Sequence, residues 1–285
     1  MPYLSIKAVL QKSLNSVFYQ AASQWSEIQP NQLDCSQYLP VTLHLRRQPF
    51  PLEYVSPLPL QLAAILKQPI QEMTSLIIEG VIEGLQGESV LGSDTLSSLE
   101  LSIMQRVTLL PSASGQLGLQ LDRAALMLWL NLLVALPWPE TQAAYPPAQV
   151  SAVGLSPLSE RLHLSPLALI QHTHARCLGL ATELPSSSAS LTETKAAPTP
   201  EAESSATATV IWALADLVDA LAAAGESVAL LQRGCLLSEA VYEWLKPFYQ
   251  ERTTNPALAS LILQAVQQTL QHLLQQLGHS APEAV

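Results

Sequence analysis

The sequence predicts an α+β protein, with a small mixed α/β N-terminal domain over residues 1–136 and an all-α helical bundle over residues 165–285. Short stretches in which apolar and polar residues alternate occur only in the first part, and this pattern is typical of half-buried strands. In the second part, apolar residues recur at the three- and four-residue spacing of helices. A connector with five prolines, residues 137–164, separates the two parts.

The N-terminal domain is expected to follow the order helix, strand, helix, helix, strand, strand, helix. Proline in the first turn starts two of these helices, and the Asp122 carboxylate can cap the last one. The expected helices are Ser5–Trp25, Pro57–Leu66, Pro69–Leu85 and Arg123–Leu136, and the expected strands are Val41–Arg46, Leu99–Val107 and Gln116–Leu121.

Arg46 and Arg47 are the only adjacent basic residues in the chain, at the end of the first expected strand. Two interpretations stand: a solvated strand end, or a contact with phosphate. We favour the solvated strand end because charged side chains at strand ends usually face water.

The helical bundle is expected to begin at Ser165, which can cap a helix that has Pro166 in its first turn. A low-complexity segment, residues 185–209, predicts a flexible linker or disordered insertion, and order is expected to resume at Val210. Gly225 and Gly278 are expected to end helices, and Pro247 is expected to end or kink one. The last helix carries a run of glutamines on its expected outer face: Gln264, Gln267, Gln268, Gln271, Gln275 and Gln276.

The composition of the chain argues against some classes of function. The formal net charge is −10 and only 13% of residues are charged, which argues against strong autonomous binding of RNA or DNA. The three cysteines, Cys35, Cys177 and Cys235, are far apart and predict buried thiols in a reducing compartment. The chain shows no signal-peptide pattern, and its most apolar run, residues 124–136, is too short to span a bilayer. We therefore expect a soluble cytoplasmic protein without membrane association.

The sequence offers no catalytic, cofactor-binding or metal-binding residues. His172 and His174 lie two apart on an expected helix, so they point in different directions and cannot share a metal. We expect His174 and Arg176 to satisfy polar groups where this helix packs on its neighbours. Cys177 next to His174 lacks a local catalytic signature. Asp216 and Asp219 share a helix face, where a solvated or salt-bridged surface is a commoner explanation than a functional carboxylate pair.

Residues Gln171–Arg176, with the sequence QHTHAR, resemble the Gln-Tyr-Ala-His-Ala-Arg signature at the entry to the DALR anticodon-binding domain of arginyl-tRNA synthetases. Gln171, His174, Ala175 and Arg176 match the signature. The resemblance implies that residues 165–285 form a DALR-type helical bundle.

The C-terminus supports this resemblance. Glu226–Ser227 and the aromatic pair Phe248–Tyr249 resemble a helix pair of the same domain. Leu277–Gly278 and Ala281–Glu283 match the family's terminal segment in register, whereas its final Arg-Met is replaced by Ala284–Val285.

The N-terminal domain is similar to the additional domain of the same synthetases. Residues 54–63 resemble the family's segment before a helix, and residues 114–121 lie where the family has Pro-Gly-Phe-Ile-Asn-Phe-x-Leu. In the family, the Asn of that segment helps to read a base in the D-loop of the tRNA. Gly118 replaces this Asn and Gln116 replaces the first Phe, so the base-reading chemistry is not evident here.

The catalytic domain of the synthetases has no counterpart. It would lie between the two matched blocks, and a doubly wound nucleotide-binding domain cannot fit into the connector of residues 137–164. Neither the His-Ile-Gly-His nor the Lys-Met-Ser-Lys-Ser signature is present. The resemblance therefore implies a non-catalytic protein.

Two functions remain open from the sequence. One is a synthetase-like protein that associates weakly with tRNA or the translation machinery, and the other is a protein-interaction scaffold that has lost tRNA binding. The neutral, glutamine-rich last helix favours the second, because interface cores are depleted in charge. The aromatic residues of the bundle are expected to fill its core. The candidate contacts for RNA or a partner are Gln171, His174, Arg176, Arg233, Trp244 and Lys246.

Overall fold

The computed structural model describes residues 5–28, 41–47, 51–86, 98–138, 157–183, 205–223, 225–248 and 256–282. These residues form ten helices and one four-stranded sheet, so the predicted α+β class is confirmed. The chain divides into two compact units. We call Ile6–Leu128 the sheet unit and Met1–Ser5 with Trp129–Val285 the helical unit.

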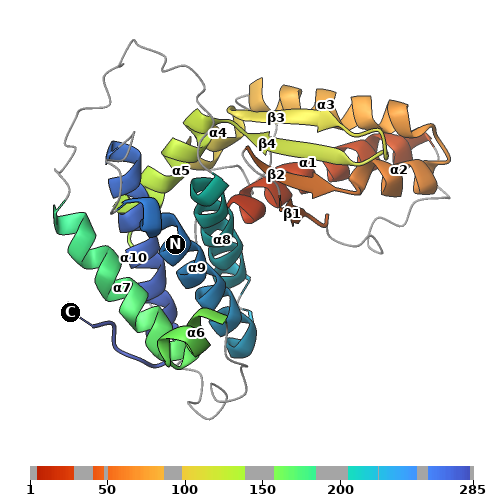
Figure 1. Cartoon of the computed structure of the whole chain (residues 1–285). Coiled ribbons are helices and arrows are strands. Elements are labelled where there is room, and N and C mark those ends of the chain that lie inside the picture. The colour runs from red at the N-terminus through yellow and green to blue at the C-terminus, as the bar shows by residue number, and fades with distance from the viewer. Residues whose placement is uncertain are drawn as a thin grey trace. The chain divides into compact units, whose positions relative to one another are not determined.

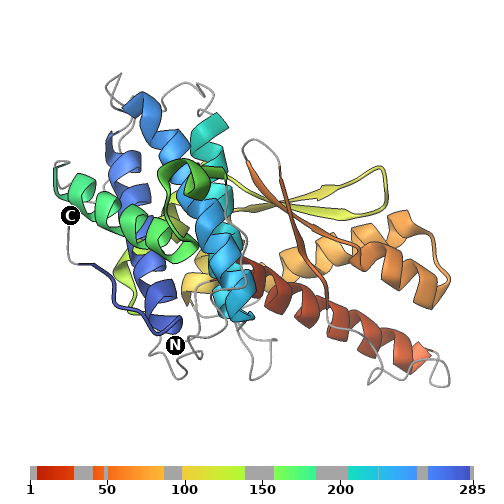
Figure 2. The ribbon, with the colours of Figure 1, turned by 60° about the horizontal axis from the view of Figure 1, so that its bottom comes forward.

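The sheet unit contains an antiparallel sheet in the order β1-β2-β4-β3 (Figure 1). Helices α1 and α3 run along one side of it (Figure 2). Tyr54 at the centre of β2 pairs with Leu45 on β1 and Leu119 on β4. The elements are α1 (Ile6–Ile28), β1 (His44–Arg46), β2 (Leu52–Ser56), α2 (Leu58–Leu66), α3 (Ile70–Gln86), α4 (Ser98–Met104), β3 (Val107–Pro111), β4 (Leu117–Leu121) and α5 (Arg123–Ala135), whose last turns belong to the helical unit.

One face of the sheet is buried, as strand alternation requires. Tyr54 on β2 and the leucines of β4 are fully buried, whereas Glu53 and Val55 on the other face are half-buried. The predicted cap of α5 is confirmed, because Ala125 N donates to Asp122 Oδ1 at 2.6 Å.

Two predictions for this unit were wrong. Residues 99–107 were expected as one strand, but helix α4 occupies most of that stretch and β3 starts only at Val107. Ile103 and Met104 are both buried, a spacing that suits a helix, and Ser102 Oγ donates to Ser98 O one turn earlier. Strand β2 was not predicted, because it is only five residues long and leads directly into Pro57 and α2.

The helical unit consists of the last turns of α5 with α6 (Pro157–Leu162), α7 (Pro166–Glu183), α8 (Ser205–Ala222), α9 (Ser227–Phe248) and α10 (Pro256–Gln276). Helix α7 packs on both α10 and α9, and α8 packs on α9 (Figure 1). Aliphatic side chains from all four fill the core, including Leu169, Ile170, Leu214, Leu231 and Leu273.

Three residues predicted to start or end a helix lie at the ends of helices in the structure. Ser165 Oγ accepts from Ala168 N at 3.2 Å, Pro247 lies in the last turn of α9, and Gly278 adopts a φ of 76° just after α10. Helix α6 in the connector was not predicted. Order was expected to resume at Val210, but α8 begins at Ser205; residues 184–204, which hold most of the predicted insertion, lie outside the described residues.

Helix α8 is the one described helix with the length and apolar composition of a membrane span, with a mean hydropathy of 1.4 over 18 residues. In the helical unit, 61% of that stretch is buried. A buried helix of a globular unit can have the same length and composition, and α8 contributes ten buried residues to this unit.

Candidate functional site

The segment that resembles the DALR signature lies on α7, and its polar side chains leave the helix in different directions. Gln171 faces the residues that follow α10, because its Nε2 donates to Ser280 O at 3.4 Å. His174 is buried against α10, and Arg176 lies against α9. Each residue therefore contacts a different neighbour of α7.

His174 is 2% exposed and lies beside Gln267 of α10. Its Nε2 is 3.0 Å from the Gln267 amide nitrogen, which can only donate, so the neutral ring accepts there and carries its proton on Nδ1. The same amide nitrogen donates to Gln271 Oε1 at 3.2 Å. Burial lowers the pKa of His174 below its usual 6.5, and the Pro282 backbone offsets only part of this effect.

Nδ1 of His174 is buried and has no hydrogen-bond partner of good geometry among the described residues. The Pro282 backbone nevertheless lies close enough to the ring to favour its charged form. The expectation that His174 meets polar groups where α7 packs on its neighbours therefore agrees with its contacts to Gln267 and to the Pro282 backbone.

Arg176 lies over the ring of Tyr242 on α9, with its guanidinium carbon 5.1 Å from the ring centroid. The Tyr242 hydroxyl is hydrogen-bonded to Nδ1 of His172, and the two rings stack with centroids 5.9 Å apart. We call these three residues the Tyr242 cluster. Tyr242 is only half-buried, so the expectation that the bundle's aromatic residues all fill its core is wrong for this residue.

The other candidate contacts lie on α9 and do not converge with one another. Arg233 and Lys246 are 13 residues apart on one helix, a separation of about 20 Å. Arg233 Nε is 2.9 Å from Asp216 Oδ2, and Lys246 pairs with Glu243. Trp244 is buried, as expected, and its Nε1 donates to Thr207 Oγ1 at 3.1 Å.

Asp216 forms an ion pair with Arg233, which agrees with the interpretation of a solvated or salt-bridged helix face. Within the described parts of the chain, no group of three or more His, Cys, Asp and Glu side chains is placed to hold a metal ion.

Cys177 and Cys235 are buried as predicted, and burial raises the pKa of both thiols to about 12. Cys35 lies outside the described residues.

The glutamines of α10 were expected on an outer face, which is wrong for two of them. Gln267 contacts His174, and Gln268 Nε2 donates to Val134 O at 3.1 Å. Trp138 adds to this packing, because its Nε1 lies 3.4 Å from Gln268 Oε1 and its ring stacks on His272 at 5.0 Å. These amides join α10 to α7 and to the end of α5.

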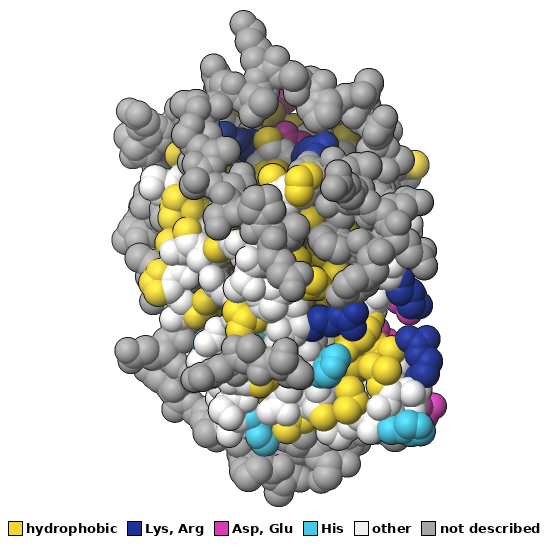
Figure 3. All heavy atoms as spheres, turned by 60° about the vertical axis from the view of Figure 1, so that its left-hand side comes forward, with side chains coloured by type: hydrophobic (Ala, Val, Ile, Leu, Met, Phe, Trp, Pro, Cys, Tyr) yellow, Lys and Arg dark blue, Asp and Glu magenta, His cyan; other side chains and the backbone are white. Residues whose placement is uncertain are grey.

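Figure 3 shows the side of the molecule on which α7 lies in Figure 1. Lys, Arg and His side chains gather there beside an apolar surface, and few acidic side chains are visible on this face.

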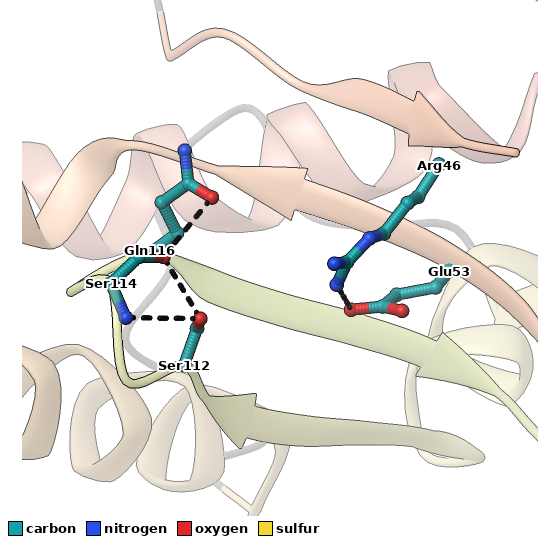
Figure 4. Close-up of polar contacts among 5 residues, drawn as sticks. All are labelled: Arg46, Glu53, Ser112, Ser114 and Gln116. Carbon is teal, nitrogen blue, oxygen red and sulfur yellow. Dashed lines mark hydrogen bonds and ion pairs between the residues drawn. The ribbon is translucent and has the colours of Figure 1, made fainter. Parts of the chain in front are cut away.

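In the sheet unit, the two positions singled out by the resemblance have ordinary structural roles. Gln116 ends a chain of polar contacts in the β3–β4 turn, where Ser114 Oγ donates to its Oε1 at 3.4 Å (Figure 4). Arg46 was singled out for a different reason, because it adjoins Arg47. It pairs with Glu53 across β1 and β2 at 3.5 Å in an exposed position, which agrees with the interpretation of a solvated strand end. A Cβ at Gly118 would lie 2.9 Å from Glu53 Oε1, which is the end of a flexible side chain that can move aside, and 3.3 Å from Leu110 O.

Sequence reasoning missed the partners of the candidate residues, namely Tyr242, Gln267 and Ser280. No local pattern marks them, because they lie on other elements that only the packing brings to α7. No protein-family model, no curated protein and no solved structure matches this chain.

Proposed function

We propose that this protein is a non-catalytic relative of arginyl-tRNA synthetases whose helical unit associates weakly with tRNA or with the translation machinery. One observation carries the proposal: the two segments that resemble the family most specifically lie together. Gln171 in the α7 segment donates to Ser280, 109 residues later, and the backbone at Pro282 acts on His174. The two resembling segments thus lie on neighbouring parts of the helical unit, where α7 packs on α10.

The charge of the helical unit supports weak binding. Arg233 and Lys246 are each paired with a carboxylate, and the Arg176 guanidinium lies on an aromatic ring. A cation already paired with an acid must give up that pair before it neutralises a phosphate, so each one adds little affinity. The basic and histidine side chains seen in Figure 3 leave a contact surface for an anion, without the dense positive charge of a strong RNA binder.

We expect the isolated protein to bind tRNA with a dissociation constant on the order of 10⁻⁴ to 10⁻⁶ M at physiological salt, with little preference for arginine acceptors. Fluorescence anisotropy with labelled arginine tRNA and a second labelled tRNA measures both properties. Each phosphate contact should contribute about 0.7 to 0.9 to the slope of log affinity against log salt.

Three variants sharpen this measurement. Arg176→Ala and Lys246→Ala should each reduce the salt slope by about one contact. Glu243→Gln tests the opposite effect to Lys246→Ala. It removes the carboxylate that pairs with Lys246, so the lysine becomes available to a phosphate and tRNA binding should become stronger. Sub-micromolar binding that is selective for arginine tRNA would show that the weak-binding prediction is wrong. If no salt-dependent binding of tRNA is detected, the proposed association with tRNA is refuted.

The alternative function is a protein-interaction scaffold that has lost tRNA binding. Helix α10 favours it, because this 21-residue helix carries no charged side chain and so suits a desolvated contact. A pull-down from native extract, with and without ribonuclease, separates the two functions. A protein partner that stays bound after ribonuclease treatment supports the scaffold, whereas recovery of tRNA supports the synthetase-like function.

We also expect neither arginine charging nor ATP–pyrophosphate exchange. The reason lies in the sequence, which has no room for a nucleotide-binding domain and lacks the two synthetase signatures. A standard aminoacylation assay on rigorously purified protein measures this. Charging of tRNA that persists through successive purification steps would contradict the proposal.

A further inference from the structure

Strand β3 lies at an edge of the sheet, so only one side of its backbone has a neighbouring strand (Figure 1). In an antiparallel pair, residues alternate between those whose backbone bonds to the neighbour and those whose backbone points away. Ser112, just after β3, bonds to β4's side, because its N donates to Gln116 O at 2.9 Å. Counted back in steps of two, Leu110 and Thr108 also bond to β4.

The other three residues of β3 turn their backbone groups away from β4. Val107 and Leu109 each offer an N–H and a C=O there, and Pro111 offers a C=O only. Within the described parts of the chain, these outward groups have no hydrogen-bond partner. The edge of β3 therefore presents donors and acceptors that a further strand can use.

The two edges of the sheet differ in how open they are. Natural sheets usually protect an edge with charged side chains, proline or a very short strand. Strand β1 is three residues long and ends at the exposed Arg46. Strand β3 has five residues and no charged side chain, and its Leu110 is 39% exposed. Pro111 is its last residue, where it removes one donor and leaves those of Val107 and Leu109.

The edge of β3 is complementary to a second copy of itself. Antiparallel pairing about a two-fold axis at Leu109 sets this residue opposite its equal and sets Val107 opposite Pro111. Each Leu109 N–H then donates to the other Leu109 C=O, and each Val107 N–H donates to a Pro111 C=O. Every outward N–H of both strands finds an acceptor, so the proline fits this register.

The side chains suit the same arrangement. Thr108 would lie directly opposite Leu110 of the other copy, at a Cα separation of about 4.5 Å, and would cover part of the exposed leucine. A two-fold contact brings identical charges together, and each copy carries a net charge of −10. A strand without charged side chains avoids local repulsion, and the guanidinium of the adjacent Arg106 donates to Ser102 O of its own chain.

We propose that β3 pairs with β3 of a second copy, which joins two sheets into one across a weak, two-fold symmetric dimer. Two paired strands of five residues bury less than the roughly 1,200 Å² of a standard stable interface, and the net charge of each copy opposes their approach. The dimer therefore forms only at high protein concentration. It involves the sheet unit and does not depend on the proposed association with tRNA.

Disulfide trapping in the full-length chain tests the register. In a Cys35→Ser background, one sample carries Thr108→Cys and the other carries Leu110→Cys, both at exposed positions. Across the two-fold axis, positions 108 and 110 are about 4.5 Å apart and can form a disulfide, whereas two equal positions are about 7–8 Å apart and cannot. Cys177 and Cys235 stay unreactive, because both are buried with thiol pKa values of about 12.

Mild oxidation of the mixed samples should yield several-fold more covalent dimer than oxidation of either sample alone. Gel electrophoresis without reductant measures this yield. The two separate samples are the matched controls, because each exposes one new thiol on the same face of the same strand.

Sedimentation velocity of the native protein, from about 1 μM to about 500 μM, measures the association without a cross-link. The mass should rise from monomer toward dimer over this range. Thr108→Lys with Leu110→Lys places lysines opposite each other in the dimer and should abolish the rise. The matched variant, Thr108→Glu with Leu110→Lys, places opposite charges there and should retain it.

A monomer at every concentration would overturn the proposal, as would equal covalent yields in the mixed and separate samples. Equal association of the two charge variants would also overturn it, because the contact would then lie elsewhere. None of these readouts involves RNA, so a negative result leaves the tRNA proposal standing. Salt distinguishes the two as well, because screening of the net charge should strengthen the dimer but weaken tRNA binding.

Discussion

Replacing Leu273 by alanine is expected to lower the free energy of unfolding by about 2–5 kcal/mol. Leu273 lies on α10, is fully buried and fills the space where α10, α9 and α7 meet. The substitution removes apolar contacts and leaves a cavity that the surrounding helices close only in part. Urea denaturation followed by circular dichroism measures the loss.

Gly234 on α9 turns this substitution into a sharper test. A Cβ at Gly234 would lie 2.5 Å from Leu273 Cδ2 and 2.8 Å from Ile170 Cδ1, so Gly234→Ala overpacks the native core. In the Leu273→Ala background the clash with Leu273 is gone and only the one with Ile170 remains, so Gly234→Ala should destabilise that background less than it destabilises the native protein.

The control for this cycle is Gly179→Ala on α7, where an added Cβ meets nothing within 4 Å. It should stabilise the protein by about 0.5–1 kcal/mol in both backgrounds. If Gly234→Ala stabilises the native protein as much as Gly179→Ala does, the close approach of the three helices at Gly234 is refuted.

Tyr54→Ala is expected to produce a loss of similar or larger size, about 3–5 kcal/mol, in the sheet unit. Tyr54 is fully buried at the centre of β2, between Leu45 on β1 and Leu119 on β4. Its ring fills the core on one side of the sheet, and no neighbouring side chain on that strand can replace it.

The adjacent residue Val55 is the matched control, because successive residues of a strand point to opposite faces. Val55 is half-buried and pairs with Gly118, so Val55→Ala should cost about 1 kcal/mol or less. Equal losses for Tyr54→Ala and Val55→Ala in urea denaturation would contradict a sheet with a single buried face.

The candidate site was only partly predictable from sequence. The six candidate residues were chosen for their type and position, and α7 does carry Gln171, His174 and Arg176 as expected. The pairing of Lys246 with Glu243 follows from i, i+3 spacing on a helix and was accessible to the sequence. The pairing of Arg233 with Asp216 was not, because it depends on how α8 packs against α9.

The sequence by itself determined the features that depend on neighbouring residues. Helical spacing and capping side chains placed α5 after Asp122 and α7 after Ser165, since a cap acts within three residues of its helix. The α+β class followed in the same way, from alternation in the first part and helical periodicity in the second.

Tertiary structure alone decided the features that join distant segments. Residues 99–107 suit both a helix and a strand by pattern, and their split into α4 and β3 followed from pairing with β4. The contacts of α7 with Tyr242, Gln267 and Ser280 span 70, 93 and 109 residues. Contacts at such separations form only when the chain packs, because no local propensity selects a partner so far along the sequence.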